Sequence, residues 1–100
     1  MNITKNMNGG VLEIAAEGRL DTGTAPQMEN ELKSSIENAD SVVFDFAKLD
    51  YISSAGLRVL LSANKEMLKK GKKPVKIINA NEIVKEVFDV TGFSDILDIA

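Results

Sequence analysis

The sequence predicts an α/β fold: a mixed, mostly parallel sheet of four to five strands, with an antiparallel hairpin at its N-terminal edge and three to four helices. Residues 3–17 contain two strand-like segments around Asn8-Gly9-Gly10, a sequence typical of a tight hairpin turn. After residue 24, amphipathic helical segments alternate with short apolar segments of strand length. Because repeated strand–helix–strand units require parallel strands with right-handed crossovers, we expect one domain spanning residues 1–100.

The N-terminal half predicts three strands and one helix. The first two strands are Ile3–Met7 and Val11–Glu17, and the second alternates its side chains between two faces. A helix follows Thr24-Ala25-Pro26-Gln27, which has the spacing of a capping box and tolerates proline in the first turn. This helix is expected to end near Asn38, and the third strand is Ser41–Phe46. The apolar stripe of the helix consists of Ala25, Met28, Leu32 and Ile36.

The C-terminal half predicts two longer helices, one strand and a short closing segment. The first helix begins after Ser54 and runs to about Lys70, where a glycine stops it. The strand Val75–Ile78 leads to a second helix capped by Asn79 or Asn81. Gly92 suits a left-handed residue at the end of this helix, Phe93 folds back onto it, and Ile96–Ile99 forms a short helix or strand. The positions expected to face the core are Leu57, Leu60, Leu61, Met67 and Leu68 in the first helix, and Ile83, Val84, Val87 and Phe88 in the second.

The composition argues against most kinds of enzyme. The chain has no histidine and no cysteine, so it cannot form a Ser-His-Asp triad, a Cys-His dyad, a zinc–thiolate site or a disulfide. No pair of carboxylates stands apart from ordinary surface acids, and no phosphate-binding glycine motif is present. We therefore expect a protein that is not an enzyme, with no cofactor and no metal.

Charge and hydropathy limit the partners. The net charge of −3 argues against general binding to nucleic acid, which needs a basic face. No apolar run is long enough to cross a membrane, and the first residues do not resemble a secretory signal, so a cytoplasmic location is expected. One local basic cluster leaves two interpretations open: solvation of a helix end, or steering of an acidic partner. It consists of Lys65, Lys69, Lys70, Lys72, Lys73 and Lys76.

Two segments are predicted to meet at one rim of the sheet. Loops at the carboxyl ends of parallel strands converge, so the loop Asp21–Thr24 lies beside Asp50–Ser54 if the second strand runs parallel to the third. Ser53 and Ser54 fall where the first turn of a helix leaves backbone N–H groups unpaired. Such a place favours a hydroxyl cap, and it also favours an anion such as a phosphate carried by a serine. This arrangement predicts a phosphate switch.

Three motifs resemble the STAS family, and in particular its bacterial anti-sigma factor antagonists. The first is Tyr51-Ile52-Ser53-Ser54-Ala55-Gly56-Leu57, similar to the family's signature around its phosphorylated serine. The second is Glu17-Gly18-Arg19-Leu20-Asp21, and the third is Val87-Phe88-Asp89-Val90-Thr91-Gly92-Phe93. They occur in the family's order and spacing across nearly the whole chain. One departure is that this chain has Ser53 where many antagonists have aspartate.

The resemblance implies a switch between protein partners. An unphosphorylated antagonist binds a serine kinase that otherwise holds a sigma factor, and so releases the sigma factor. The kinase then phosphorylates the antagonist, and a PP2C-type phosphatase resets it. The matching phosphorylation site is Ser54, with Ser53 as the alternative site and the more natural cap. Residues expected to bind the partner are Asp21, Thr22, Gly23, Ser53, Ala55, Gly56 and Arg58.

Two other functions are consistent with the same fold. The chain could instead serve as a STAS subunit of another assembly, such as a stress-signalling complex or a transporter accessory. It could also be a sensor that binds a nucleotide or a lipid at the same rim.

Overall fold

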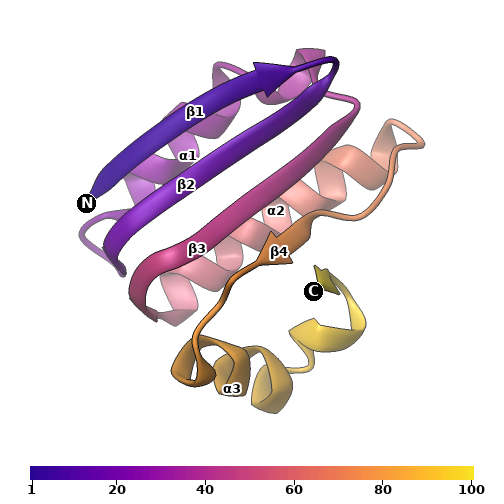
Figure 1. Cartoon of the computed structure of the whole chain (residues 1–100). Coiled ribbons are helices and arrows are strands. Elements are labelled where there is room, and N and C mark those ends of the chain that lie inside the picture. The colour runs from indigo at the N-terminus through magenta and orange to yellow at the C-terminus, as the bar shows by residue number, and fades with distance from the viewer.

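The computed structural model describes all 100 residues and contains one five-stranded sheet with strand order β1-β2-β3-β4-β5 (Figure 1). The first pair of strands is antiparallel and the other three pairs are parallel, which confirms the predicted fold class. The strands are β1 (Asn2–Asn8), β2 (Val11–Leu20), β3 (Ser41–Ile52), β4 (Lys76–Ile78) and β5 (Asp98–Ile99). The helices are α1 (Ala25–Lys33), α2 (Ser54–Lys69) and α3 (Glu82–Thr91), with short 3₁₀ turns at Ile36–Asn38 and Phe93–Asp95.

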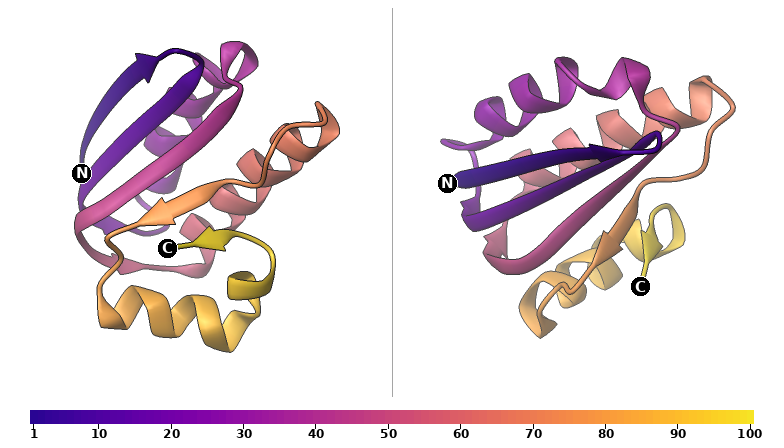
Figure 2. Two further views of the ribbon diagram at one scale, coloured as in Figure 1. Left: turned by 45° about the vertical axis from the view of Figure 1, so that its right-hand side comes forward. Right: turned by 45° about the horizontal axis from the view of Figure 1, so that its top comes forward.

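Helices α1 and α2 cover one face of the sheet, and α3 lies at its far end, beside β4 (Figure 1). Figure 2 shows the short strand β5 returning to the edge of the sheet next to β4. The core lies between the sheet and the two covering helices, where Ile14, Phe44, Met28 and Leu60 are fully buried. The opposite face of β1–β3 carries no helix, so its side chains are mostly polar and exposed. None of the helices combines the length and the apolar character that a membrane-spanning helix needs.

The N-terminal hairpin forms as predicted. Asn8 pairs with Val11, and the two glycines between them have φ values of 55° and 87°. Positive φ at both central residues gives the turn a twist that matches the twist of its strands. The hairpin therefore places β1 as an antiparallel edge strand, while the longer β2 continues into the interior of the sheet.

The predicted ends of β2 and β3 were wrong, because both strands continue further. β2 extends to Leu20 and β3 extends to Ile52 rather than to Phe46. The register changes between the pairs Ala15–Asp45 and Glu17–Lys48, which leaves one extra residue in β3. The Asp45 carboxylate accepts a hydrogen bond from the Ala47 N–H (3.0 Å) within this bulge. The bulge interrupts the apolar alternation of the sequence but not the ladder.

The start and end of α1 also differ from the prediction. The capping box is absent, since the Thr24 hydroxyl donates to the Arg19 carbonyl (2.7 Å) and accepts from the Asp21 N–H (2.9 Å). The Gln27 amide donates to the carbonyl of Met1 (3.0 Å) instead of returning to the helix start. The helix ends at Lys33, and the predicted last turn is a separate 3₁₀ turn. Thr24 therefore fastens the loop before α1 rather than the helix itself.

Three residues assigned to the core lie outside it: Leu61, which is partly exposed and does not pack against the core, and Leu68 and Ile83. Leu68 in α2 is 50% exposed and Ile83 in α3 is 59% exposed. In α2 the buried set includes Asn64, whose side-chain oxygen accepts from the Val75 N–H (2.9 Å), so the buried face is rotated away from Leu68. In α3 the buried residues are Val84 and Phe88.

The other predicted features of the C-terminal half are present. Asn81 caps α3 by accepting from the Val84 N–H (2.8 Å), which decides between the two candidate asparagines. Gly92 is left-handed, and Phe93 packs against the core. The closing segment is the two-residue strand β5, which pairs with β4.

Lys5, on the face of β1 that the helices cover, connects the edge strand to α1. Lys5 projects from β1 toward α1, and its ammonium group lies 2.9 Å from the Glu31 carboxylate. It also donates to the hydroxyls of Ser34 (2.9 Å) and Ser35 (3.0 Å). These contacts tie β1 to α1 in addition to the hydrogen bonds that it makes with β2.

The first turn of α2 lies directly against the ends of β2 and β3. A Cβ atom on Gly56 would meet Ile52 Cγ1 at 2.8 Å, Leu20 Cγ at 2.8 Å and the Leu20 carbonyl oxygen at 2.9 Å. One of these atoms belongs to the backbone of β2, so it cannot move aside alone. The absence of a side chain at position 56 thus sets how closely the helix approaches the sheet.

We predict that Gly56→Ala destabilises the protein. Overpacking at this contact costs about 1–3 kcal/mol, and the better helix propensity of alanine returns at most about 1 kcal/mol. Thermal unfolding followed by circular dichroism measures the change. Ser54→Ala is the matched control in the same helical turn, since Ser54 is exposed. A Gly56→Ala protein as stable as this control would show that the helix can move outward without cost.

Candidate functional site

The parallel pairing of β2 and β3 brings the two predicted loops together. Arg19 pairs with Tyr51 and Leu20 with Ile52, so both strands end at the same level. The Ser53 N–H, directly after β3, donates to the carbonyl of Leu20, the last residue of β2 (2.9 Å), and so joins the two strand ends. The expectation that Asp21–Thr24 and Asp50–Ser54 meet at one rim is therefore confirmed.

Asp21 organises its own loop. Its Oδ1 atom accepts from the N–H groups of Gly23 (3.0 Å) and Thr24 (3.2 Å) and from the Thr24 hydroxyl (3.3 Å). Desolvation acts to raise the pKa of Asp21, but these hydrogen bonds and the charge of Arg19 outweigh it and hold the pKa below its ordinary value. With a lowered pKa, the contribution to stability is present above the unfolded-state pKa and is lost as the pH falls through the folded-state pKa. Asp21 is consequently a fixed negative charge at neutral pH.

Arg19 and Tyr51 extend the rim beside Asp21. The guanidinium of Arg19 lies over the Tyr51 ring, 4.5 Å from its centre, and Arg19 Nε is 3.7 Å from Asp21 Oδ2. Neither residue was predicted to belong to the site. Both stand inside the motifs that carry the family resemblance, but only the strand register shows that they face each other. The contacts hold the Arg19 side chain across the ends of both strands.

The two serines have different surroundings. Ser53 occupies the N-cap position of α2 with extended backbone angles (φ −99°, ψ 176°), but its side chain makes no capping hydrogen bond. Its hydroxyl oxygen is buried and has no hydrogen-bond partner. The prediction that Ser53 is the capping hydroxyl was therefore wrong. Ser54, the first residue of the helix, is exposed.

The start of α2 has unpaired donors next to Ser54. The first helical hydrogen bond runs from the Leu57 N–H to the Ser53 carbonyl (2.9 Å), and no protein group accepts from the N–H groups of Ser54, Ala55 or Gly56. Three free N–H groups at the positive end of a 16-residue helix attract an anion. Arg58 lies four residues after Ser54, on the same side of the helix, and is exposed.

The remaining predicted residues divide between the surface and the interior. Thr22 and Gly23 are exposed in the loop, and Ala55 is nearly buried. A shallow hollow of about 340 Å³ connects Thr22, Ala55 and Arg58. Gly56 was expected to keep the first turn open to a partner, but it faces Leu20 and Ile52 on the buried side. Its contribution is to packing, and a partner does not reach it from this rim.

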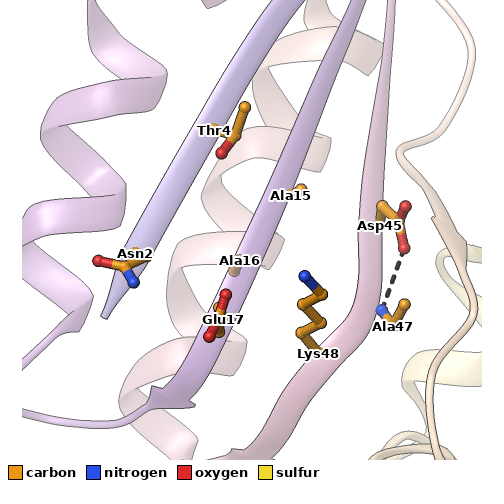
Figure 3. Close-up of a pocket in the computed structure, with 8 residues that line it drawn as sticks. All are labelled: Asn2, Thr4, Ala15, Ala16, Glu17, Asp45, Ala47 and Lys48. Atoms are coloured by element: carbon orange, nitrogen blue, oxygen red, sulfur yellow. Dashed lines mark hydrogen bonds between the residues drawn. The ribbon is translucent and has the colours of Figure 1, made fainter.

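A second hollow lies on the uncovered face of the sheet, away from the rim. Its volume is about 160 Å³. Figure 3 shows its lining across β1, β2 and β3, with Thr4 on β1, Ala15 and Glu17 on β2, and Asp45 and Lys48 on β3. The Asp45 carboxylate is already used by the Ala47 N–H and by the Asn79 amide (3.1 Å). These two hydrogen bonds of Asp45 hold the β3 bulge in place. No group of three or more acidic, histidine or cysteine side chains is arranged to hold a metal ion.

Comparison with known proteins places this geometry in a family. The model of the STAS domain matches residues 2–100. The chain is 35% identical to the Bordetella bronchiseptica protein named "Putative anti-sigma factor antagonist BtrV", over 100% of this chain and 86% of the relative. It is 28% identical to the "Anti-sigma-B factor antagonist" of Bacillus subtilis, over 100% of this chain and 91% of the relative.

A solved structure supports the same assignment at the level of the fold. The Bacillus cell fate determinant SpoIIAA in its phosphorylated form superposes with a TM-score of 0.75 and 18% identity, over 99% of this chain and 91% of SpoIIAA. Because the family model spans the described fold almost from end to end, the chain belongs to the STAS domain family.

Proposed function

We propose that this chain, as a single STAS domain, is an anti-sigma factor antagonist controlled by phosphorylation of Ser54. The unphosphorylated protein binds an anti-sigma factor with serine kinase activity, and the sigma factor is released. Phosphorylation by that kinase ends the binding, and a PP2C-type phosphatase restores it. The names of the two sequence relatives support this role, as do the two motifs at the rim, Glu17–Asp21 and Tyr51–Leu57. The protein acts without catalysis of its own, in the cytoplasm where a sigma factor works.

The accessibility of Ser54 is the observation that carries the proposal. Its hydroxyl is on an exposed residue at the start of α2, whereas the hydroxyl of Ser53 is buried below it. A kinase must approach the modified oxygen from solvent, so the structure favours Ser54 over Ser53. The unpaired N–H groups of Ala55 and Gly56 would lie next to the phosphate and stabilise it within the folded protein.

The switch acts through charge at the partner surface. A phosphoryl group adds about −1.5 to −2 charges at neutral pH. A hundredfold loss of affinity corresponds to about 2.8 kcal/mol, and leaving such a charge unpaired in an interface costs at least that much. Asp21 adds a permanent negative charge to the same rim, while Arg58 adds a positive one. In this proposal Thr22, Gly23 and Ala55 contact the partner between these charges.

We predict that Ser54→Ala folds normally and binds the kinase, but is not switched off by ATP. The serine side chain makes no hydrogen bond, so its removal changes the free energy of unfolding by less than about 0.5 kcal/mol. Phosphopeptide mapping after incubation with kinase and ATP identifies the modified residue. Ser53→Ala is the matched control and should be phosphorylated like the parent. Phosphate found on Ser53 would reverse the assignment.

We also predict that Ser54→Asp separates charge from refolding. The carboxylate lies beside free helix N–H groups, so the melting temperature should stay within a few degrees of the parent. Binding to the kinase should fall at least tenfold, as measured by calorimetry. Asn6→Asp adds the same charge on the uncovered face of the sheet and should bind like the parent. If authentic phosphoserine 54 binds the kinase undiminished, the proposed switch is wrong.

A third prediction concerns Asp21. Asp21→Asn keeps an oxygen that can accept the loop hydrogen bonds but removes the charge, so the fold should be retained. We expect kinase binding or the rate of Ser54 phosphorylation to fall at least fivefold. Titration calorimetry and a phosphorylation time course measure the two quantities. An Asn variant that matches the parent in both would reduce Asp21 to a residue that only shapes its loop.

A further inference from the structure

Helices α1 and α2 do not close completely against each other. The hollow of about 340 Å³ near Arg58 continues into a second hollow of about 280 Å³ further along the same pair of helices. Glu29, Val59 and Ser62 line both hollows, so the two form one continuous channel on the helix face of the molecule. We call this channel the α1–α2 groove. It begins at the rim and runs away from Ser54 toward the other end of α2.

The far half of the groove has an apolar floor. Leu32 and Ile36 approach from α1 and the 3₁₀ turn that follows it, and Val59 and Ala63 approach from α2. All four belong to the hydrophobic core, but their outer atoms line the hollow. A partner side chain placed there would therefore extend the core instead of resting on a polar surface.

The edges of the far half of the groove carry negative charge that no ion pair neutralises. Glu37 and Glu66 both line the hollow, and neither takes part in an ion pair. The Lys33 Nζ atom lies 3.9 Å from Glu29 Oε1, so Lys33 pairs with Glu29 and not with Glu37 or Glu66. The ammonium of Lys70 donates to the backbone carbonyls of Ile36 (2.6 Å) and Glu37 (3.0 Å), and not to a carboxylate.

We propose that the far half of the α1–α2 groove binds the anti-sigma factor kinase through one apolar side chain flanked by lysine or arginine. This inference rests on the proposed function and identifies a second part of the same interface. The apolar floor matches the apolar side chain, and Glu37 and Glu66 match the flanking cations. The groove is continuous with the rim, so one partner surface can cover both.

The two parts of the interface respond differently to phosphate. Glu66 follows Ser54 by twelve residues of α2, which is about 18 Å along the helix axis. Charges at exposed sites are largely screened beyond about 8 Å at physiological ionic strength. A phosphate on Ser54 therefore weakens contacts at the rim and leaves the groove unchanged. In this proposal the groove contributes a constant part of the binding free energy, and phosphorylation lowers the total affinity by weakening the contacts at the rim.

Two groove variants test this surface without touching the core. Glu66→Lys reverses a charge at the edge of the α1–α2 groove, and Ser62→Trp fills the groove from an exposed position. Each should weaken binding of the purified kinase at least tenfold, measured by calorimetry at about 0.15 M salt, while circular dichroism shows the parent fold. The loss in Glu66→Lys should shrink as salt is raised, and the loss in Ser62→Trp should not. Glu86→Lys, which makes the same charge change on the exposed surface of α3, should bind like the parent.

A double variant separates this inference from the switch itself. Sites that act independently contribute additively. The fold-loss of Ser54→Asp,Glu66→Lys should therefore equal the product of the two single losses. If both groove variants bind like the parent while Ser54→Asp is weakened, the groove is not part of the interface and the proposed function stands. If Glu86→Lys is weakened as much as Glu66→Lys, the effect is general charge and the groove assignment is wrong. If Ser54→Asp binds normally as well, the proposed function fails.

Discussion

The contact between the first turn of α2 and the ends of β2 and β3 sets the geometry of the whole rim. Gly56 allows the helix to approach Leu20 and Ile52 at a distance that no other residue permits, and the Ser53 N–H is bonded to the Leu20 carbonyl at the same place. This contact fixes where α2 starts relative to the ends of β2 and β3. The positions of the exposed Ser54 and of Arg58 follow from where the helix begins, and the Ser53–Leu20 hydrogen bond sets them beside the loop of Asp21.

Contacts within the chain position the rim before any partner arrives. The Asp21 loop is held by its own carboxylate and by the Thr24 hydroxyl, and Arg19 is held between Tyr51 and Asp21. An interface of this kind loses little conformational entropy on binding, so a small chain can bind tightly with few contacts.

The sequence was sufficient for features that depend on local chemistry or on simple periodicity. The hairpin at Gly9-Gly10 and the left-handed Gly92 belong to this class, whereas the parallel pairing of β2 with β3 was only a condition that the structure fulfils. The meeting of the two loops also followed, because parallel strands allow no other arrangement. The resemblance to the STAS family was recognised from the order of three motifs, and hydrophobic pattern and composition alone would not have revealed it.

The features that could not be predicted depend on a tertiary partner. Asn64 is buried because the Val75 N–H needs an acceptor, and nothing near Asn64 in the sequence reveals that need. The β3 bulge at Ala47 and the inward hydroxyl of Ser53 arise in the same way, from contacts made after the elements pack. Ile83 follows helical spacing but lies outside the buried stripe, since periodicity finds a stripe and does not fix its exact edge.

The lysine beneath the edge strand limits how this protein can associate. β1 leaves one row of backbone groups unpaired, and a strand from another molecule could in principle continue the sheet there. Such a strand would have to place its own side chains beside the Lys5 ammonium and the Glu31 carboxylate, a charged environment that does not favour an apolar strand. At the β1 edge, the Lys5–Glu31 ion pair therefore disfavours extension of the sheet by an apolar strand.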